Sequence, residues 1–144
     1  MGRTREIVDR FWDRYLAGDY ESLAQLVDRD VECRMPLGVV LHGRDEVFPL
    51  LRGYLAAIPD LGHEVVCAVE EGDRLAFELR VTGHHTRTLA MPGRELPPTG
   101  NEIPVESVDV IQVADDRIVS WHAYYDPIPF LTQLGAMPAS PATA

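Results

Sequence analysis

Residues 102–126, EIPVESVDVIQVADDRIVSWHAYYD, decide the fold class of this chain. Apolar and polar side chains alternate on both sides of residues 114–116, which is typical of two antiparallel strands joined by a tight turn. An earlier stretch, residues 63–85, HEVVCAVEEGDRLAFELRVTGHH, shows the same period of two about a Glu-Glu-Gly-Asp turn. The second half of the chain therefore predicts two β-hairpins that build an antiparallel sheet.

The first part of the chain predicts helices instead. Residues 4–17 carry apolar side chains at the three-and-four spacing of an amphipathic helix. Shorter helices are predicted over Glu21–Val27 and after Gly43, with a strand over residues 31–37 between them. Pro49 is expected to distort or shorten the first turns of the third helix. Helices first and strands later predict an α+β domain whose helices cover one face of the sheet and leave a conical cavity.

Length and charge limit the classes of function. The chain has 144 residues, of which 46% are hydrophobic, and this predicts one domain over residues 1–135 with a disordered tail over residues 136–144. The net charge of −10 argues against nucleic acid or an anionic membrane surface as a partner, because the overall electrostatic force would be repulsive. No apolar stretch has the length of a signal peptide or a membrane span, so we predict a cytoplasmic protein.

No motif indicates a metal or a cofactor. His84 and His85 are adjacent in a predicted strand and point to opposite faces, so they cannot easily bind one metal ion. The chain has neither a Gly-rich phosphate loop nor a dinucleotide-binding motif. We therefore expect chemistry that depends on the protein's own acids and bases.

Several segments resemble the nuclear transport factor 2-like superfamily. They are AGDYESLAQLV, MPLGVVLHGRDEV, PPTGNEIPVESVDVIQVADDRIVSW and the closing YYDP and QLG. Within the superfamily the chain is most similar to SnoaL-type polyketide cyclases and limonene-epoxide hydrolase-like proteins, over nearly its whole length up to Gly135. The resemblance implies a cone-shaped fold with N-terminal helices packed on a curved, mainly antiparallel sheet. This fold supports isomerases, cyclases, hydrolases and non-catalytic binding domains, so the reaction stays open.

The catalytic residues of these families point first to Asp126. In the cyclases, an aspartate that closes the last strand is the acid/base group, and Asp126 matches it. The histidine that the cyclases hold in the preceding strand corresponds to Gln112 in this chain. In the epoxide hydrolases, Asp126 and Arg80 match two catalytic residues, but Thr82 replaces the general-acid aspartate. In steroid isomerases of this fold, only Asp109 matches.

Strand parity adds further candidates and leaves two interpretations of each. Arg80, Thr82 and His84 share one polar face of a strand, which is either a pocket wall or the solvent-facing side of the sheet. Glu32 and Arg34 stand where the epoxide hydrolases hold their water with tyrosine and asparagine, and they carry the same two interpretations.

The acidic candidates also have structural explanations. Asp126 directly precedes Pro127, and this is a good N-cap for a short helix as well as a suitable place for an acid/base group. His122 has the parity of Asp126, so it is either a proton shuttle or a surface or interface residue. Asp109 is either a buried acid or a strand residue that faces water.

We predict a cofactor-independent acid/base enzyme that acts on a small hydrophobic oxygenated molecule, by polyketide-like ring closure or isomerisation. An altered epoxide opening and a non-catalytic binding domain are the alternatives. The predicted catalytic residues are Asp126, Arg80, His122 and Asp109. The predicted substrate-binding residues are Phe11, Trp12, Tyr15, Glu32, Arg34, Tyr54, Thr82, His84, Gln112, Trp121 and Tyr124.

A homodimer that pairs through the outer face of the sheet is also predicted. The apolar strand residues exceed what three short helices can cover, and an apolar sheet face left in water favours association. The residues that suggest this excess are Val65, Phe77, Leu79, Val81, Val108, Val110, Val119 and Tyr125.

Overall fold

The computed structural model describes residues 2–91 and 93–137, and its first three helices precede most of its strands as predicted. The helices are α1 (Arg3–Leu16), α2 (Tyr20–Leu26), α3 (Arg44–Ala57) and α4 (Pro127–Gln133). The strands are β1 (Val27–Met35), β2 (Val39–His42), β3 (Gly62–Glu71), β4 (Arg74–Thr82), β5 (Leu89–Met91), β6 (Arg94–Leu96), β7 (Val105–Ala114) and β8 (Arg117–Tyr125). Of the predicted disordered tail, residues 138–144 lie outside the described residues.

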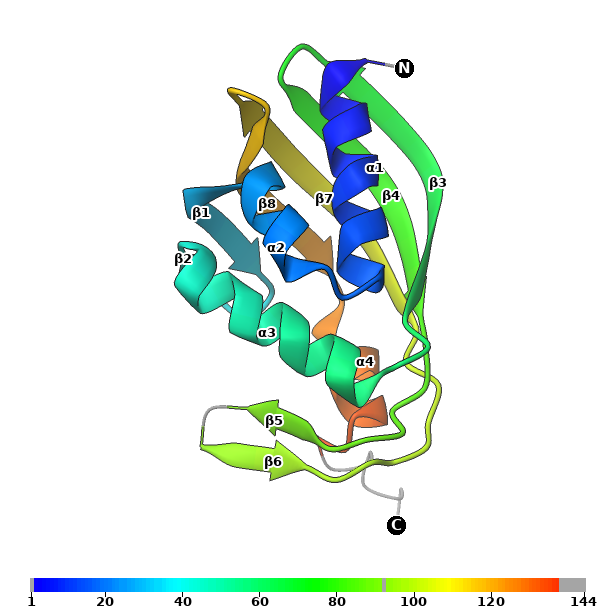
Figure 1. The fold of residues 1–144 in the computed structure, drawn as a ribbon. Helices are drawn as coiled ribbons and strands as arrows, with labels where there is room; N and C mark the ends of the chain where they lie inside the picture. Colours follow the sequence, from blue (N-terminus) through cyan, green and yellow to red (C-terminus); the bar gives the residue numbers. More distant parts are fainter. Residues whose placement is uncertain (1, 92, 138–144) are drawn as a thin grey trace.

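Six strands form one curved sheet in the order β2-β1-β8-β7-β4-β3. All neighbouring strands are antiparallel except β1 and β8, which are parallel. Helices α1, α2 and α3 lie across one face of this sheet (Figure 1). The result is the predicted α+β arrangement, with a space enclosed between the helices and the sheet.

Both predicted hairpins are confirmed. Strands β3 and β4 pair about Gly72, and β7 and β8 pair about Asp115 and Asp116. The last two residues have φ angles of 51° and 61°, which match the two positive φ angles of a type I′ turn. This turn has the same twist as its strands and fixes their register.

The structure differs from the sequence-based expectation in α3. Pro49 lies inside this helix, yet the helix begins at Arg44 and continues to Ala57, so Pro49 does not shorten its first turns; a distortion of these turns stays a prediction. Pro49 is on the exposed side of the helix. Water can therefore hydrogen-bond the carbonyl group that the missing N–H leaves without a partner.

A two-stranded sheet of β5 and β6, which local sequence patterns do not predict, lies between the two hairpins along the chain. Leu89 and Leu96 pair across it and are both 2% exposed. They pack in a second hydrophobic cluster with the end of α3 and with Phe130 of α4. Figure 1 shows this small sheet beside α3 and α4, at the end of the molecule away from the start of α1.

The side chains of each strand alternate between a covered inner face and an open outer face. In β4, Leu75, Phe77 and Leu79 are 1–2% exposed and belong to the main core, whereas Glu78 and Arg80 are exposed. Most of the apolar strand residues predicted to exceed the helical cover also lie inside, because they line the core or the cavity. These are Val65, Phe77, Leu79, Val81 and Tyr125.

Candidate functional site

A cavity of about 190 Å³ lies between the helices and the inner face of the sheet. Its wall is almost entirely apolar and aromatic. From α1 and α3 the lining residues include Phe11, Trp12, Tyr15, Leu51 and Tyr54, and from the sheet they include Cys33, Met35, Leu79, Ser107, Asp109, Trp121 and Tyr125. Such a cavity favours a hydrophobic ligand with few polar groups.

Asp109 provides the acidic group of this cavity. Of the described residues that line it, Asp109 alone carries a carboxylate, and none is Lys, Arg or His. The alternation of β7 turns Asp109 inward together with Ser107 and Ile111, and its side chain is 4% exposed. The interpretation of Asp109 as a strand residue that faces water is therefore wrong, and the buried-acid interpretation is correct.

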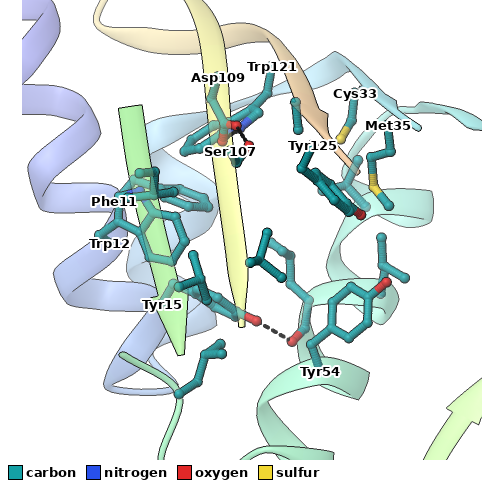
Figure 2. A pocket seen from close by; sticks show the side chains of 18 of the residues that line it. Phe11, Trp12, Tyr15, Cys33, Met35, Tyr54, Ser107, Asp109, Trp121 and Tyr125 are labelled. Atoms are coloured by element: carbon teal, nitrogen blue, oxygen red, sulfur yellow. Dashed lines mark hydrogen bonds between the residues drawn. The ribbon is translucent and has the colours of Figure 1, made fainter. Parts of the chain in front are cut away.

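Two neighbours hold the Asp109 carboxyl group in place. The hydroxyl of Ser107 donates a hydrogen bond to Oδ1, and Nε1–H of Trp121 donates to Oδ2 at 2.7 Å. Figure 2 shows these three side chains together on one side of the cavity, with Tyr54 lying apart from them. The carboxyl thus has a fixed orientation at the wall of an apolar space.

Burial is the main influence on the acidity of Asp109. Removal from water raises the pKa of this carboxyl above its usual range, and the hydrogen bonds from Ser107 and Trp121 oppose part of that rise. Desolvation favours the neutral acid because an ionised carboxylate is costly in apolar surroundings. Asp109 is thus shifted toward the range in which a group can both give and take a proton near neutral pH.

Five of the six aromatic residues predicted to bind substrate line the pocket, and Tyr124 is the exception. Phe11 and Trp121 are in contact, with ring centroids 4.9 Å apart, and Trp12 stacks on His63 at 4.4 Å. Tyr15 and Tyr54 complete these five. The three-and-four spacing of α1 places its aromatic side chains on one face, which is the face that packs on the sheet. Their role in substrate binding stays a prediction.

The predicted pocket position of Asp126 is wrong. Its side chain is exposed, and Oδ1 accepts a hydrogen bond from Ile128 N–H at 3.0 Å. Asp126 is the N-cap of α4, with Pro127 as the first helical residue. It is not among the residues that line the cavity. The structure therefore supports the capping interpretation, because the parity of β8 turns Tyr125 inward at this end of the strand.

The supporting residues predicted for Asp126 also lie outside the cavity. Arg80 projects from the outer face of β4, where it pairs with Glu64 at 3.4 Å and Glu106 at 3.5 Å. His122 lies on the outer face of β8, with Nε2 3.9 Å from a carboxylate oxygen of Glu32. These side chains point away from the helices, so they cannot reach a ligand in the cavity.

The remaining polar candidates also lie outside the cavity. Glu32 pairs with Arg34 at 2.8 Å on the outer face of β1. His84 is exposed and bonds Asp60 at 2.6 Å. Gln112 donates to Asp73 at 3.2 Å.

Thr82 and Tyr124 complete the outer set, and neither is among the residues that line the cavity. Tyr124 is 60% exposed. All of these candidates lie outside the cavity, because the helices cover the opposite face of the sheet, so the expectation that they line the pocket is wrong.

Neither a metal site nor a membrane span is found in the described part of the chain. Residues 2–91 and 93–137 contain no group of three or more His, Cys, Asp or Glu side chains that could hold a metal ion. No helix in these ranges is long and apolar enough to cross a membrane.

Comparison with known proteins identifies the family of this chain. The family model of the SnoaL-like polyketide cyclases matches residues 3–134. The chain belongs to the SnoaL-like polyketide cyclase family. No curated protein matches the chain.

Solved structures confirm the SnoaL-like fold. A protein from Jannaschia sp. CCS1, named as a candidate SnoaL-like polyketide cyclase, superposes with a TM-score of 0.79 at 19% identity, over 94% of each chain. IdmH from Streptomyces antibioticus, named as a candidate polyketide cyclase, gives a TM-score of 0.73 at 24% identity, over 93% of this chain and 99% of its own. TsrD from Streptomyces laurentii superposes with a TM-score of 0.75 at 20% identity, over 94% of this chain and 96% of its own.

Sequence reasoning missed part of the site of this SnoaL-like protein. Ser107, Cys33, Met35, Tyr125 and Phe130 line the cavity. A usable signal was present in β7, where Ser107 and Asp109 stand two residues apart and therefore share a face. Tyr125 also carried this signal, because it shares the parity of Trp121 in β8, whereas the position of Phe130 depends on how α4 packs after the strand.

Proposed function

We propose that this SnoaL-like protein is an acid/base enzyme that moves a proton on a small, hydrophobic, oxygenated molecule, as a cyclase or isomerase that needs no cofactor. The observation that carries the proposal is the buried carboxyl of Asp109 in an otherwise apolar and aromatic cavity. Asp109 thereby takes the acid/base role that the sequence alone assigned to Asp126. Carboxyl groups whose pKa is raised by burial are frequent at catalytic sites.

The hydrogen bonds of Asp109 suit both of its protonation states. Trp121 Nε1–H can only donate, so it fixes one carboxyl oxygen as an acceptor in either state. The Ser107 hydroxyl donates to the ionised carboxylate, and after rotation it can accept from the protonated acid. A proton can therefore be taken up and released while both oxygens remain hydrogen-bonded.

This arrangement supports proton abstraction next to a carbonyl group. The Asp109 carboxylate removes a proton from the carbon beside the substrate carbonyl, and the electron pair of that C–H bond forms an enolate. In isomerisation, Asp109 returns the proton to another carbon. In ring closure, the enolate carbon bonds to a second carbonyl carbon, and Asp109 delivers the proton to the new alkoxide oxygen. The aromatic walls exclude water that would otherwise compete for the proton.

Epoxide opening, the second enzymatic alternative, receives less support. The residues matched to the epoxide hydrolase site are Arg80, Thr82 and Asp126, and none of them lines the cavity. Opening an epoxide requires an acid for the ring oxygen and a base for the attacking water. Asp109 can provide one of these functions, but the described cavity wall offers no second carboxyl group.

Deuterium incorporation into 2-indanone tests the proposal without knowledge of the natural substrate. This ketone is neutral and carries exchangeable protons beside its carbonyl group. We expect the protein in D₂O to accelerate exchange, as followed by NMR, and Asp109→Asn to reduce the acceleration at least a hundredfold, in line with the usual contribution of general acid/base catalysis. The variant Asp73→Asn, altered on the surface, is the matched control. Equal rates with and without the protein, or an unchanged rate in Asp109→Asn, would favour a non-catalytic binding domain.

A further inference from the structure

The cavity has a second polar feature apart from Asp109. Tyr54 of α3 and Tyr125 of β8 both line it, and both rings pack edge-on against Phe130, with centroids 5.8 and 5.9 Å away. In Figure 2 these two tyrosines lie on the side of the cavity away from Phe11 and Trp12. Helix α4 holds Phe130 in place, so the end of the chain supports both tyrosine rings.

The hydroxyl groups of these two tyrosines have no hydrogen-bond partner among the described residues. Tyr15, the third tyrosine of the cavity wall, donates to the Leu51 carbonyl at 2.8 Å. In contrast, no hydrogen bond joins the hydroxyl of Tyr54 or Tyr125 to any group within residues 2–91 and 93–137. Neither hydroxyl is among the fully buried polar atoms that lack a partner, so each keeps accessible surface while its ring lines the cavity. Phenylalanine would provide the same packing here, so the two free hydroxyls point to a ligand.

The protonation state of the pair restricts what it can bind. Burial raises the pKa of Tyr125 to about 12 and that of Tyr54 above its usual range. Both hydroxyls are therefore neutral near pH 7, and each can donate one hydrogen bond and accept others. Since no Lys, Arg or His is among the described residues that line the cavity, a carboxylate or phosphate would be buried without a counter-charge. A neutral oxygen has no such cost.

We propose that Tyr54 and Tyr125 form a binding subsite for an uncharged carbonyl or hydroxyl oxygen of the ligand, while Asp109 faces another part of the same molecule. The inference rests on the proposed function in that both place the substrate in this cavity. A dry cavity of about 150 Å³ holds benzene. The larger volume of about 190 Å³ therefore fits one substituted ring, with further atoms of a longer ligand at the opening.

A pair of probes that differ in one hydroxyl group tests the subsite. We compare the dissociation constants of 4-ethylphenol and ethylbenzene, measured by fluorescence quenching of the cavity tryptophans, in wild type, Tyr54→Phe and Tyr125→Phe. Tyr124→Phe is the matched control, because Tyr124 is the neighbour of Tyr125 in β8 but is 60% exposed on the outer face. We expect wild type and control to prefer the phenol, and each cavity variant to lose about fivefold of this preference, the value of one net hydrogen bond.

The outcomes separate the subsite from the catalytic proposal. A phenol preference that survives in both cavity variants, or failure of wild type to bind either probe at millimolar concentration, would overturn the subsite. A preference lost in Asp109→Asn and retained in the tyrosine variants would also overturn it, since the phenol oxygen would then bind at Asp109. Thermal unfolding of each variant shows whether it is folded. The acid/base role of Asp109 is tested separately by exchange of 2-indanone, so either proposal can fail alone.

Discussion

Replacing Asp126 tests whether this residue caps a helix or transfers a proton. Its Oδ1 accepts from Ile128 N–H at 3.0 Å. Proline occupies positions 127 and 129, so Ile128 carries the one N–H group among the first three residues of α4. These N–H groups lack partners within a helix, and the cap supplies the partner for Ile128. Alanine removes it, whereas asparagine keeps an acceptor oxygen at the same place.

The expected effects follow from this single hydrogen bond. Loss of an Asp N-cap costs about 1 kcal/mol, and Asn is as good a cap as Asp. In a domain of this size, 1 kcal/mol corresponds to a decrease in Tm of about 3 °C. We expect this decrease in Asp126→Ala and almost none in Asp126→Asn, measured by thermal unfolding followed by circular dichroism. The rate of 2-indanone exchange in Asp126→Asn should stay within twofold of wild type, because the side chain is outside the cavity.

One result would refute this reasoning directly. If Asp126→Asn unfolds at the wild-type temperature but loses exchange activity, Asp126 acts as the acid/base group and reaches the substrate in a way that its exposed position does not indicate. The sequence-based assignment would then be restored, and Asp109 would have a supporting role.

Four further results are expected. Asp109→Asn should raise the free energy of unfolding at pH 7, measured in urea. Burial raises the pKa of Asp109 in the folded protein above the unfolded value near 3.9, so wild type loses stability as pH rises from the unfolded pKa through the folded pKa, and the uncharged Asn does not. The buried His85 should make the protein less stable at low pH, because burial lowers its pKa and the unfolded chain therefore binds a proton more readily. The free energy of unfolding should fall as pH drops below about 6.5, and the fall should be smaller in His85→Gln. Terpene epoxides such as limonene oxide should give almost no diol, as gas chromatography would show, and rapid diol formation would contradict the proposed site. We also propose a homodimer through the outer face, where Val108 is 46% exposed; sedimentation equilibrium should give about twice the chain mass of 16.1 kDa for wild type and the monomer mass for Val108→Glu.

Most of the fold could be predicted from local patterns in the sequence. The aromatic side chains of α1 recur every three or four residues, and the two hairpins alternate about turns that contain Gly72 and Asp115–Asp116. These patterns act over a few residues and need no tertiary information. The sheet of β5 and β6 could not be predicted, because its strands have three residues each and are held by the packing of Leu89 and Leu96 on α3 and α4.

The site was harder to predict, because strand parity shows which side chains share a face but not which face the helices cover. In β4 the polar face, with Arg80 and Thr82, suggested a pocket wall, yet it faces outward. In β7 the flanking residues Val105, Ile111 and Val113 fix the inner face, and Ser107 and Asp109 interrupt this apolar set.

The middle of β7 inverts the usual arrangement of a half-covered sheet. The polar Ser107 and Asp109 point inward, while the apolar Val108 and Val110 point outward. An inward carboxyl lowers stability unless it has partners, and an outward valine pair gains nothing in a monomer. Natural sequences depart from local rules mainly where a function requires it. Because one short inversion provides both the acid of the cavity and an apolar patch on the mostly polar outer face, we infer that the proposed catalysis and the proposed dimer depend on the same four residues.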